Sequence, residues 1–107
     1  MSFDFAAQKA ETFATFAEIQ AQADVPETAD VDYMFVATDG ADWGAFETAL
    51  DMAGFDAERE LDNDEPYLVA ILADQPISAL TIWMGEDMAS KIALKHGFTP
   101  DGWGFSA

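Results

Sequence analysis

VDYMFVA, residues 31–37, is the segment from which we infer the fold of this chain. It is rich in residues that favour strands, and it is apolar on both of its alternating faces. The stretch YLVAILA, residues 67–73, has the same character. Such strands are typical of the centre of a sheet that is covered on both sides. We therefore expect these two segments to be neighbouring central strands.

Three helices are expected from apolar residues that recur three or four positions apart. The first covers residues 3–22, and the second begins after Asp42 as its N-cap and is stopped by Gly54. The third covers about 78–95 and ends before Gly97, which offers a left-handed cap. Its inward stripe is expected to consist of Ile77, Leu80, Met84 and Met88.

Two further strands are expected at the edges of the sheet. FDAEREL, residues 55–61, alternates between apolar and charged positions, and its charges suit an edge. FTPDGWGF, residues 98–105, contains Pro100, which also belongs at an edge. A helix followed by the order β-α-β-β-α-β predicts a ferredoxin-like plait. This is an α+β fold with an antiparallel sheet in the order 4-1-3-2 and, here, an extra N-terminal helix.

Two helices of such a plait cover one face of the sheet, which leaves the other apolar face of the central strands without a cover. We expect the N-terminal helix to cover that face, and a partner molecule is the alternative. Without an internal repeat, a low-complexity tract or a linker, residues 1–107 are expected to form a single domain.

The charge is the most prominent feature of the composition. Four Lys and Arg residues stand against 21 Asp and Glu residues, so the formal net charge is −17. Such a surface repels phosphate backbones, which argues against direct binding of nucleic acid. It attracts basic protein surfaces, although acidity can also be an adaptation to salt, and both interpretations stay open.

The lengths of the apolar runs and the cysteine content indicate the cellular compartment that we expect for the protein. No apolar run approaches the ~18 residues that a membrane helix needs, so no membrane association is expected. The chain has no cysteine, which excludes disulfides and thiolate chemistry and favours a cytoplasmic protein.

The sequence shows no pattern of a catalytic, metal or cofactor site. The single histidine, His96, stands at an expected helix end and favours a capping role over a catalytic one. With one His and no Cys, zinc is not expected, and the turn DNDEP (62–66) lacks the residues of a calcium loop. An enzyme would need a buried carboxylate with a raised pKa, and we expect no catalytic residue and no cofactor.

The closing stretch DGWG, residues 101–104, is a strong turn motif. Asp101 followed by Gly102 favours a turn, and Gly104 permits a bulge or a close backbone approach. Together these residues should direct Trp103 back onto the sheet or a helix, so we expect Trp103 to be mostly buried.

Behind the helix end LKHG (94–97), this stretch resembles the C-terminal signature of the ribonuclease E inhibitor B family, also called regulator of ribonuclease activity B or RraB. The resemblance extends to an N-terminal helix before a plait and to marked acidity. It implies a cytoplasmic protein that binds ribonuclease E and damps its cleavage of RNA by contact, without a reaction of its own. Pro100 differs from the family pattern, in which an aromatic residue commonly stands before the aspartate that corresponds to Asp101.

The leading hypothesis is therefore a regulatory interaction protein with a basic protein partner, and a homodimer stays open. The alternative is a small-molecule-binding or sensing domain of the same fold, because one fold hosts many functions. The residues expected to contact the partner are Glu58, Glu60, Asp101, Gly102, Trp103 and Gly104.

Overall fold

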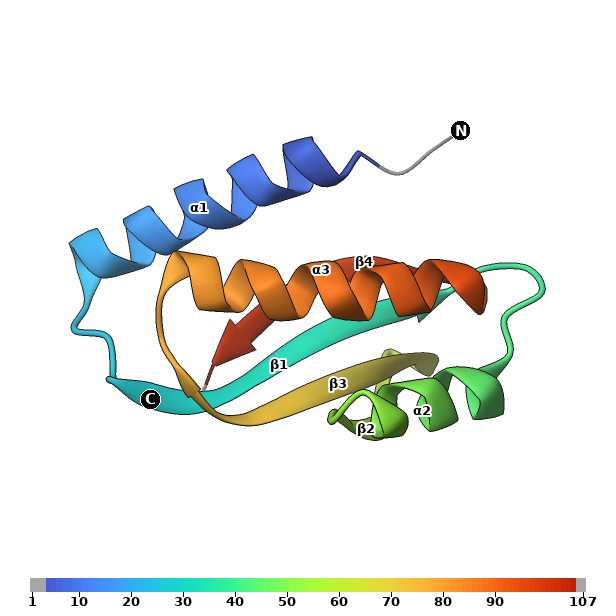
Figure 1. The fold of residues 1–107 in the computed structure, drawn as a ribbon. Coiled ribbons are helices and arrows are strands. Elements are labelled where there is room, and N and C mark those ends of the chain that lie inside the picture. Colours follow the sequence, from blue (N-terminus) through green and yellow to red (C-terminus); the bar gives the residue numbers. More distant parts are fainter. Residues whose placement is uncertain (1–3, 106–107) are drawn as a thin grey trace.

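The computed structural model describes residues 4–105 and contains three helices and four strands (Figure 1). Each expected helix and strand is present, while residue 3, the expected start of the first helix, lies outside the described residues. None of the helices within the described part is both long and apolar enough to cross a membrane. In chain order the elements are α1 (Phe5–Gln22), β1 (Thr28–Ala37), α2 (Trp43–Met52), β2 (Asp56–Asp62), β3 (Glu65–Pro76), α3 (Ala79–Lys95) and β4 (Phe98–Phe105).

The four strands form one antiparallel sheet in the order β2-β3-β1-β4. This is the expected order 4-1-3-2 read from the other edge, so the two apolar strands are central neighbours as predicted. β2 and β3 are joined by a two-residue turn in which Asn63 and Asp64 have φ angles of 52° and 66°. Two central residues with positive φ match the twist of the flanking strands, which explains the tight hairpin.

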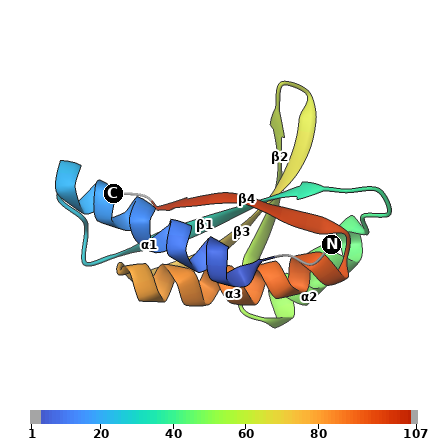
Figure 2. The ribbon, with the colours of Figure 1, turned by 90° about the horizontal axis from the view of Figure 1, so that it is seen from above.

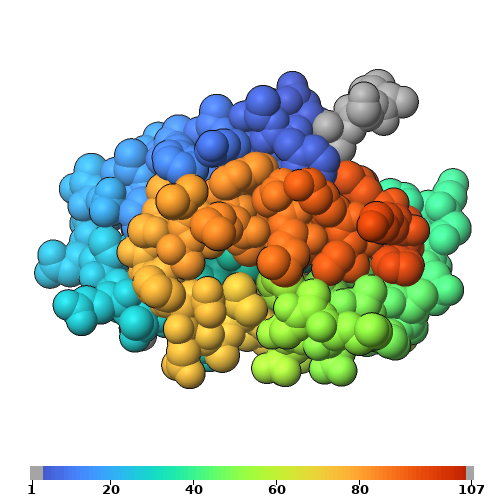
Figure 3. Space-filling view, viewed as in Figure 1, coloured from blue at the N-terminus to red at the C-terminus, as the bar shows by residue number. Residues whose placement is uncertain are grey.

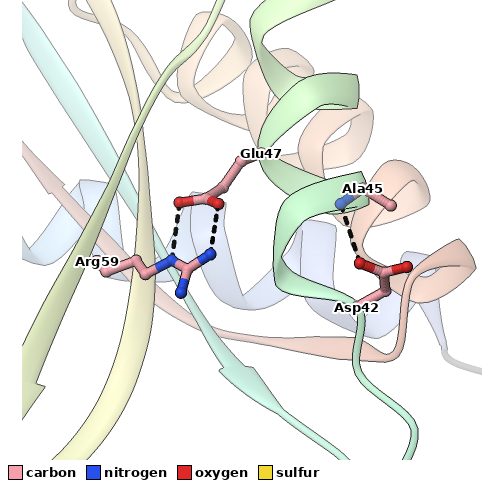
Figure 4. A network of polar contacts seen from close by, with 4 residues as sticks. All are labelled: Asp42, Ala45, Glu47 and Arg59. Atoms are coloured by element: carbon pink, nitrogen blue, oxygen red, sulfur yellow. Dashed lines mark hydrogen bonds and ion pairs between the residues drawn. The ribbon is translucent and has the colours of Figure 1, made fainter.

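Side-chain caps fix where the helices begin, as the sequence indicates for Asp42. Asp4 and Asp42 each accept a hydrogen bond from a backbone N–H three residues further on, and Ser78 does the same for α3. Figure 4 shows the contact of Asp42 with the N–H of Ala45, at 3.1 Å. Gly97, with φ +82°, directly follows the last turn of α3, as expected for a left-handed cap.

One face of the sheet carries the core. The Tyr33 hydroxyl donates to the carbonyl oxygen of Ile82 in α3 at 2.9 Å. Phe35 meets Phe46 of α2 edge-on, with ring centroids 5.4 Å apart. Figure 2 shows α2 and α3 on the same side of the sheet, and Figure 3 shows α1, α3 and α2 closing that side with little of β1 visible between them. We call this side the helix layer.

The expectation that the N-terminal helix covers the second face of the sheet is wrong. α1 lies beside α3 near the β4 edge, within the helix layer (Figures 1 and 2). Trp103 and Phe105 pair with the buried residues Tyr33 and Val31, so their rings point toward the helices. Phe16 of α1 packs on Phe105 with ring centroids 6.4 Å apart. These apolar groups at the edge hold α1 there, and no described helix covers the second face.

The inward stripe expected for α3 is also wrong. Leu80, Met84 and Met88 are exposed, Met84 by 62%. The helix instead turns its small residues inward, because Gly85 lies against the ring of Tyr33. A Cβ atom at position 85 would approach the Tyr33 Cζ to 2.8 Å. The buried residues of α3 are Ile82, Gly85, Glu86, Ala89, Ser90 and Ala93.

Candidate interaction surface

The second face of the sheet, which we call the open face, has an apolar centre. Side chains that alternate along β1 and β3 point away from the helices, because their neighbours in the sequence are the core residues. Val36 is 37% exposed and Val69 is 8% exposed, so the centre is more accessible near one end of the strands than in the middle. The apolar stripe consists of Met34, Val36, Tyr67, Val69 and Ile71.

Carboxylates flank this stripe. Every second residue of β2 shares the open face, because Glu58 pairs with Val69 and Glu60 pairs with Tyr67. Burial, together with the nearby Asp30, raises the pKa of Asp32. These two neighbouring carboxylates add negative charge to this part of the face. The acidic border comprises Asp56, Glu58, Glu60 and Asp62 of β2 and Asp30 and Asp32 of β1.

A hollow of about 370 Å³ lies at one end of the open face. Its lining includes the apolar side chains of Met34, Val36 and Tyr67. The carboxylate residues Asp62, Glu65 and Asp101 also line it, and they come from the β2–β3 hairpin and from β4. The hollow therefore combines apolar surface with negative charge, and we call it the hairpin groove.

The four basic residues of the chain all lie on the helix layer. Lys9 belongs to α1, and Lys91 and Lys95 belong to α3. Arg59 belongs to β2, but its side chain points away from the open face. It forms a bidentate ion pair with Glu47 of α2, with N···O distances of 2.7 and 3.0 Å (Figure 4). Its guanidinium also lies over the ring of Trp43, 5.2 Å from the centroid. Within residues 4–105, the open face thus carries carboxylates without a neutralising cation.

The closing stretch is divided between the two sides of the sheet. Asp101 and Gly102 together oppose Met34, which makes a bulge, and Gly102 has a φ of +119° there. The bulge therefore falls at Gly102 rather than at Gly104, which pairs with Asp32. Asp101 is exposed at the hairpin groove, whereas Trp103 points into the helix layer and is partly buried there, packed against the core.

The residues expected to contact a partner therefore do not form one patch. Glu58 and Glu60 lie on the open face along β2, and Asp101 borders the same face on β4. The apolar stripe on β3 and β1 separates them, because the sheet order is β2-β3-β1-β4. Trp103 is on the other side of the sheet, so its contacts are those of a packing residue.

Trp103 belongs to a polar cluster that sequence reasoning missed. Its indole N–H donates to the Thr12 hydroxyl at 3.3 Å, and that hydroxyl donates to the carboxylate of Glu86. The amide nitrogen of Gln8 donates to the other Glu86 oxygen at 3.2 Å and to Ser90 at 3.3 Å. Glu86 is only 5% exposed, and this burial raises its pKa. The cluster joins α1, α3 and β4.

The signal for Glu86 is its position in the sequence. It follows the buried Ile82 by four residues and precedes the buried Ala89 by three, so it lies on the inward stripe of α3. The sequence pattern placed the exposed residues Met84 and Met88 on that stripe, and Glu86 was therefore not recognised as a buried carboxylate. Glu86 also lines a hollow of about 580 Å³ between α1 and β4, together with Thr12, Asp101 and Trp103.

The side chains of His96 and Glu86 are engaged in contacts within the fold. His96 is the C-cap of α3 and stacks on Phe46, with ring centroids 6.4 Å apart. Both oxygens of Glu86 accept hydrogen bonds from α1 side chains. Within residues 4–105 no group of three or more His, Cys, Asp or Glu side chains could hold a metal ion. The open face combines the apolar stripe with the acidic border that flanks it, which suits binding to a surface that is both apolar and basic.

The model of the family described as Regulator of ribonuclease activity B matches residues 9–105, which is nearly the whole chain. The match includes α1, from Lys9 onward, and every strand of the sheet. No curated protein matches the chain.

Proposed function

Because the chain belongs to the regulator of ribonuclease activity B family, we propose that it is a non-enzymatic, cytoplasmic protein that binds ribonuclease E and modulates its cleavage of RNA by protein–protein contact. The family is one of regulators of ribonuclease activity. The resemblance of the closing stretch DGWG (101–104) to the signature of this family points in the same direction.

The observation that carries the proposal is the high negative charge of the chain, together with the placement of its basic residues away from the open face. The net charge is −17, and the four basic residues lie away from the open face. A surface of one sign attracts a partner of the opposite sign and speeds their encounter. The RNA-binding part of a ribonuclease is such a partner, because it must be basic to hold phosphates.

The same charge favours contact with the protein over contact with the RNA. Phosphate backbones and carboxylates repel each other, so this chain gains nothing by approaching the RNA directly. An acidic protein can instead occupy a basic surface that RNA would otherwise use. Modulation of cleavage then requires no chemistry from the regulator.

The experiment uses the full chain and purified ribonuclease E, with binding and RNA cleavage measured over a range of salt concentrations. We expect the association rate to fall by ~10-fold or more from low to high ionic strength, because salt screens steering. The dissociation rate should change much less, because short-range packing sets it. Absence of both binding and any effect on cleavage at low salt would overturn the proposal.

A small-molecule-binding function remains the second candidate, and one feature favours it. The hollow of about 580 Å³ between α1 and β4 has the volume of a ligand site and contains the buried carboxylate of Glu86. A rise in melting temperature with a small cationic ligand such as arginine or spermidine, lost in Glu86→Gln, would support this function.

A further inference from the structure

We infer that the open face is the docking site for a single basic segment of the partner protein. The apolar side chains of that segment lie on the stripe, and its Arg and Lys side chains pair with the acidic border. The inference rests on the proposed function, since it says where and how the protein contact is made.

The apolar stripe has the size of one segment rather than of a domain. It extends along β3 from Ile71 to Tyr67, which is about 14 Å at the rise of a strand. It is two strands wide, because Val69 pairs with Met34 and Tyr67 pairs with Val36. A single chain in extended or helical form covers such an area.

The register places each carboxylate of β2 at the end of an apolar row. Glu58, Val69 and Met34 form one row across the sheet, and Glu60, Tyr67 and Val36 form the next. The rows are about 7 Å apart, because side chains on one face of a strand recur every second residue. A segment that lies along the stripe would therefore have a carboxylate beside each of its apolar contacts. A partner segment in which Arg or Lys residues alternate with apolar residues fits this arrangement.

The hairpin groove is suited to an arginine side chain of that segment. The stem of arginine is apolar and can lie along Met34, Val36 and Tyr67. Its planar guanidinium can reach the carboxylates around the groove and can lie over the Tyr67 ring. Two carboxylates of the groove are Asp62 and Asp101. A purely apolar side chain would leave these charges without a partner.

Other occupants fit the open face less well. A second copy of this chain would bring a second acidic border against the first, so like charges would meet. An RNA strand would bring phosphates to the same carboxylates. The chain's own N-terminal helix is held elsewhere, because Thr12 and Phe16 of α1 are buried in the helix layer.

The test compares charge reversals on the two sides of the sheet. Glu58→Lys with Glu60→Lys changes the acidic border, and both residues are exposed. Glu18→Lys with Asp51→Lys makes the same change in net charge on α1 and α2, also at exposed positions. We expect the open-face pair to weaken binding to purified ribonuclease E by ~10-fold or more, and the control pair by ~2-fold or less.

A second pair of variants tests the apolar stripe without a change of charge. Val36→Asn removes an accessible apolar group from the stripe, and Met52→Asn removes one that is 84% exposed on α2. We expect Val36→Asn to raise the dissociation rate by ~5-fold or more, while Met52→Asn leaves it unchanged. Circular dichroism and melting temperature establish that each variant is folded.

The outcomes separate the two proposals. If the wild-type protein does not bind ribonuclease E, the proposed function fails and the docking site fails with it. If the wild-type protein binds, but the open-face and control variants weaken binding equally, only the docking site is overturned. Binding of labelled RNA by the wild-type protein, or its self-association, weakened in Val36→Asn but not in Met52→Asn, would overturn the choice of occupant.

Discussion

At the scale of single residues, Glu86 of α3 is the centre of a hydrogen-bonded cluster that joins α3 to α1 and β4. Its carboxylate accepts hydrogen bonds from Thr12 and Gln8 of α1, and Thr12 accepts one from Trp103 of β4. Burial raises the pKa of Glu86 from 4.5 and outweighs the opposing effect of these hydrogen bonds. The folded state therefore holds a proton on Glu86 more readily than the unfolded chain does.

Glu86→Gln should flatten the dependence of stability on pH. The stabilising contribution of the raised pKa is fully present below the unfolded value of 4.5, and it is lost as the pH rises through the folded value. Glutamine does not titrate, so the free energy of unfolding of the variant relative to wild type should increase as the pH rises. Urea unfolding between about pH 4 and pH 8 measures this.

The control for that experiment is Glu18→Gln, at an exposed position on the same side of the sheet. It removes one carboxylate without touching the cluster. A difference from wild type that is the same at every pH for Glu86→Gln would contradict the assignment of a raised pKa to this group.

Trp103→Ala should destabilise the fold by about 2–3 kcal/mol, near the lower end of large-to-small substitutions because the side chain is half-buried. It removes the ring that stacks on Phe105, with centroids 6.3 Å apart, and the hydrogen bond to Thr12. Met52→Ala, at a far more exposed position, should change the stability by less than about 0.5 kcal/mol. An unchanged melting temperature together with lost partner binding would make Trp103 a contact residue instead.

At the scale of elements, the closeness of α3 to the sheet is set by its small inward residues. Gly85 lies under the ring of Tyr33, whose hydroxyl is bonded to α3 one turn earlier. Glycine is normally unfavourable inside a helix, so its place here reflects packing rather than helix propensity. The expected stripe of Met84 and Met88 lies on the exposed side for the same reason.

Gly85→Ala should therefore destabilise the protein by roughly 1–3 kcal/mol, although alanine is the better helix former. The new methyl group would meet the Tyr33 ring, which is 1% exposed and has no room to move. Gly44→Ala in α2 is the matched control, because its Cβ would meet only the Asp42 carboxylate at 3.9 Å. Chemical unfolding should show that this control is neutral or stabilising by up to ~1 kcal/mol.

At the scale of the whole molecule, 21 carboxylates against four basic side chains make the folded state repel itself. Only two salt bridges occur within the described residues, Arg59 with Glu47 and Lys91 with Asp87, and both are largely exposed. Exposed pairs of this kind contribute little to stability. The repulsion is therefore relieved mainly by the solvent.

Salt should raise the melting temperature for this reason. Screening reduces repulsion over distances beyond about 10 Å at 0.1 M salt. A gain of about 1 kcal/mol corresponds to roughly 4–8 °C for a domain of this size. Calorimetry between about 10 mM and about 0.5 M sodium chloride measures the effect, and a flat melting temperature would show that the charges are too dispersed to matter.

The elements of this protein and their order in the sheet follow from local patterns of the amino-acid sequence. VDYMFVA (31–37) and YLVAILA (67–73) identify central strands because only the middle of a sheet suits segments that are apolar on both faces. Asp42 and Gly97 identify helix ends because capping is local chemistry between neighbours in the chain. The charges of Glu58 and Glu60 likewise identified an edge strand with an acidic face.

What covers each face of the sheet depends instead on contacts between elements that are distant in the chain. Placing α1 requires knowing that Trp103 and Phe105 point toward the helices, which follows from their pairing with Tyr33 and Val31. That pairing depends on the bulge at Gly102, because an extra residue reverses the side to which the residues after it point. The open face, its stripe and its acidic border result from contacts between residues distant in the chain, and local patterns do not encode such contacts.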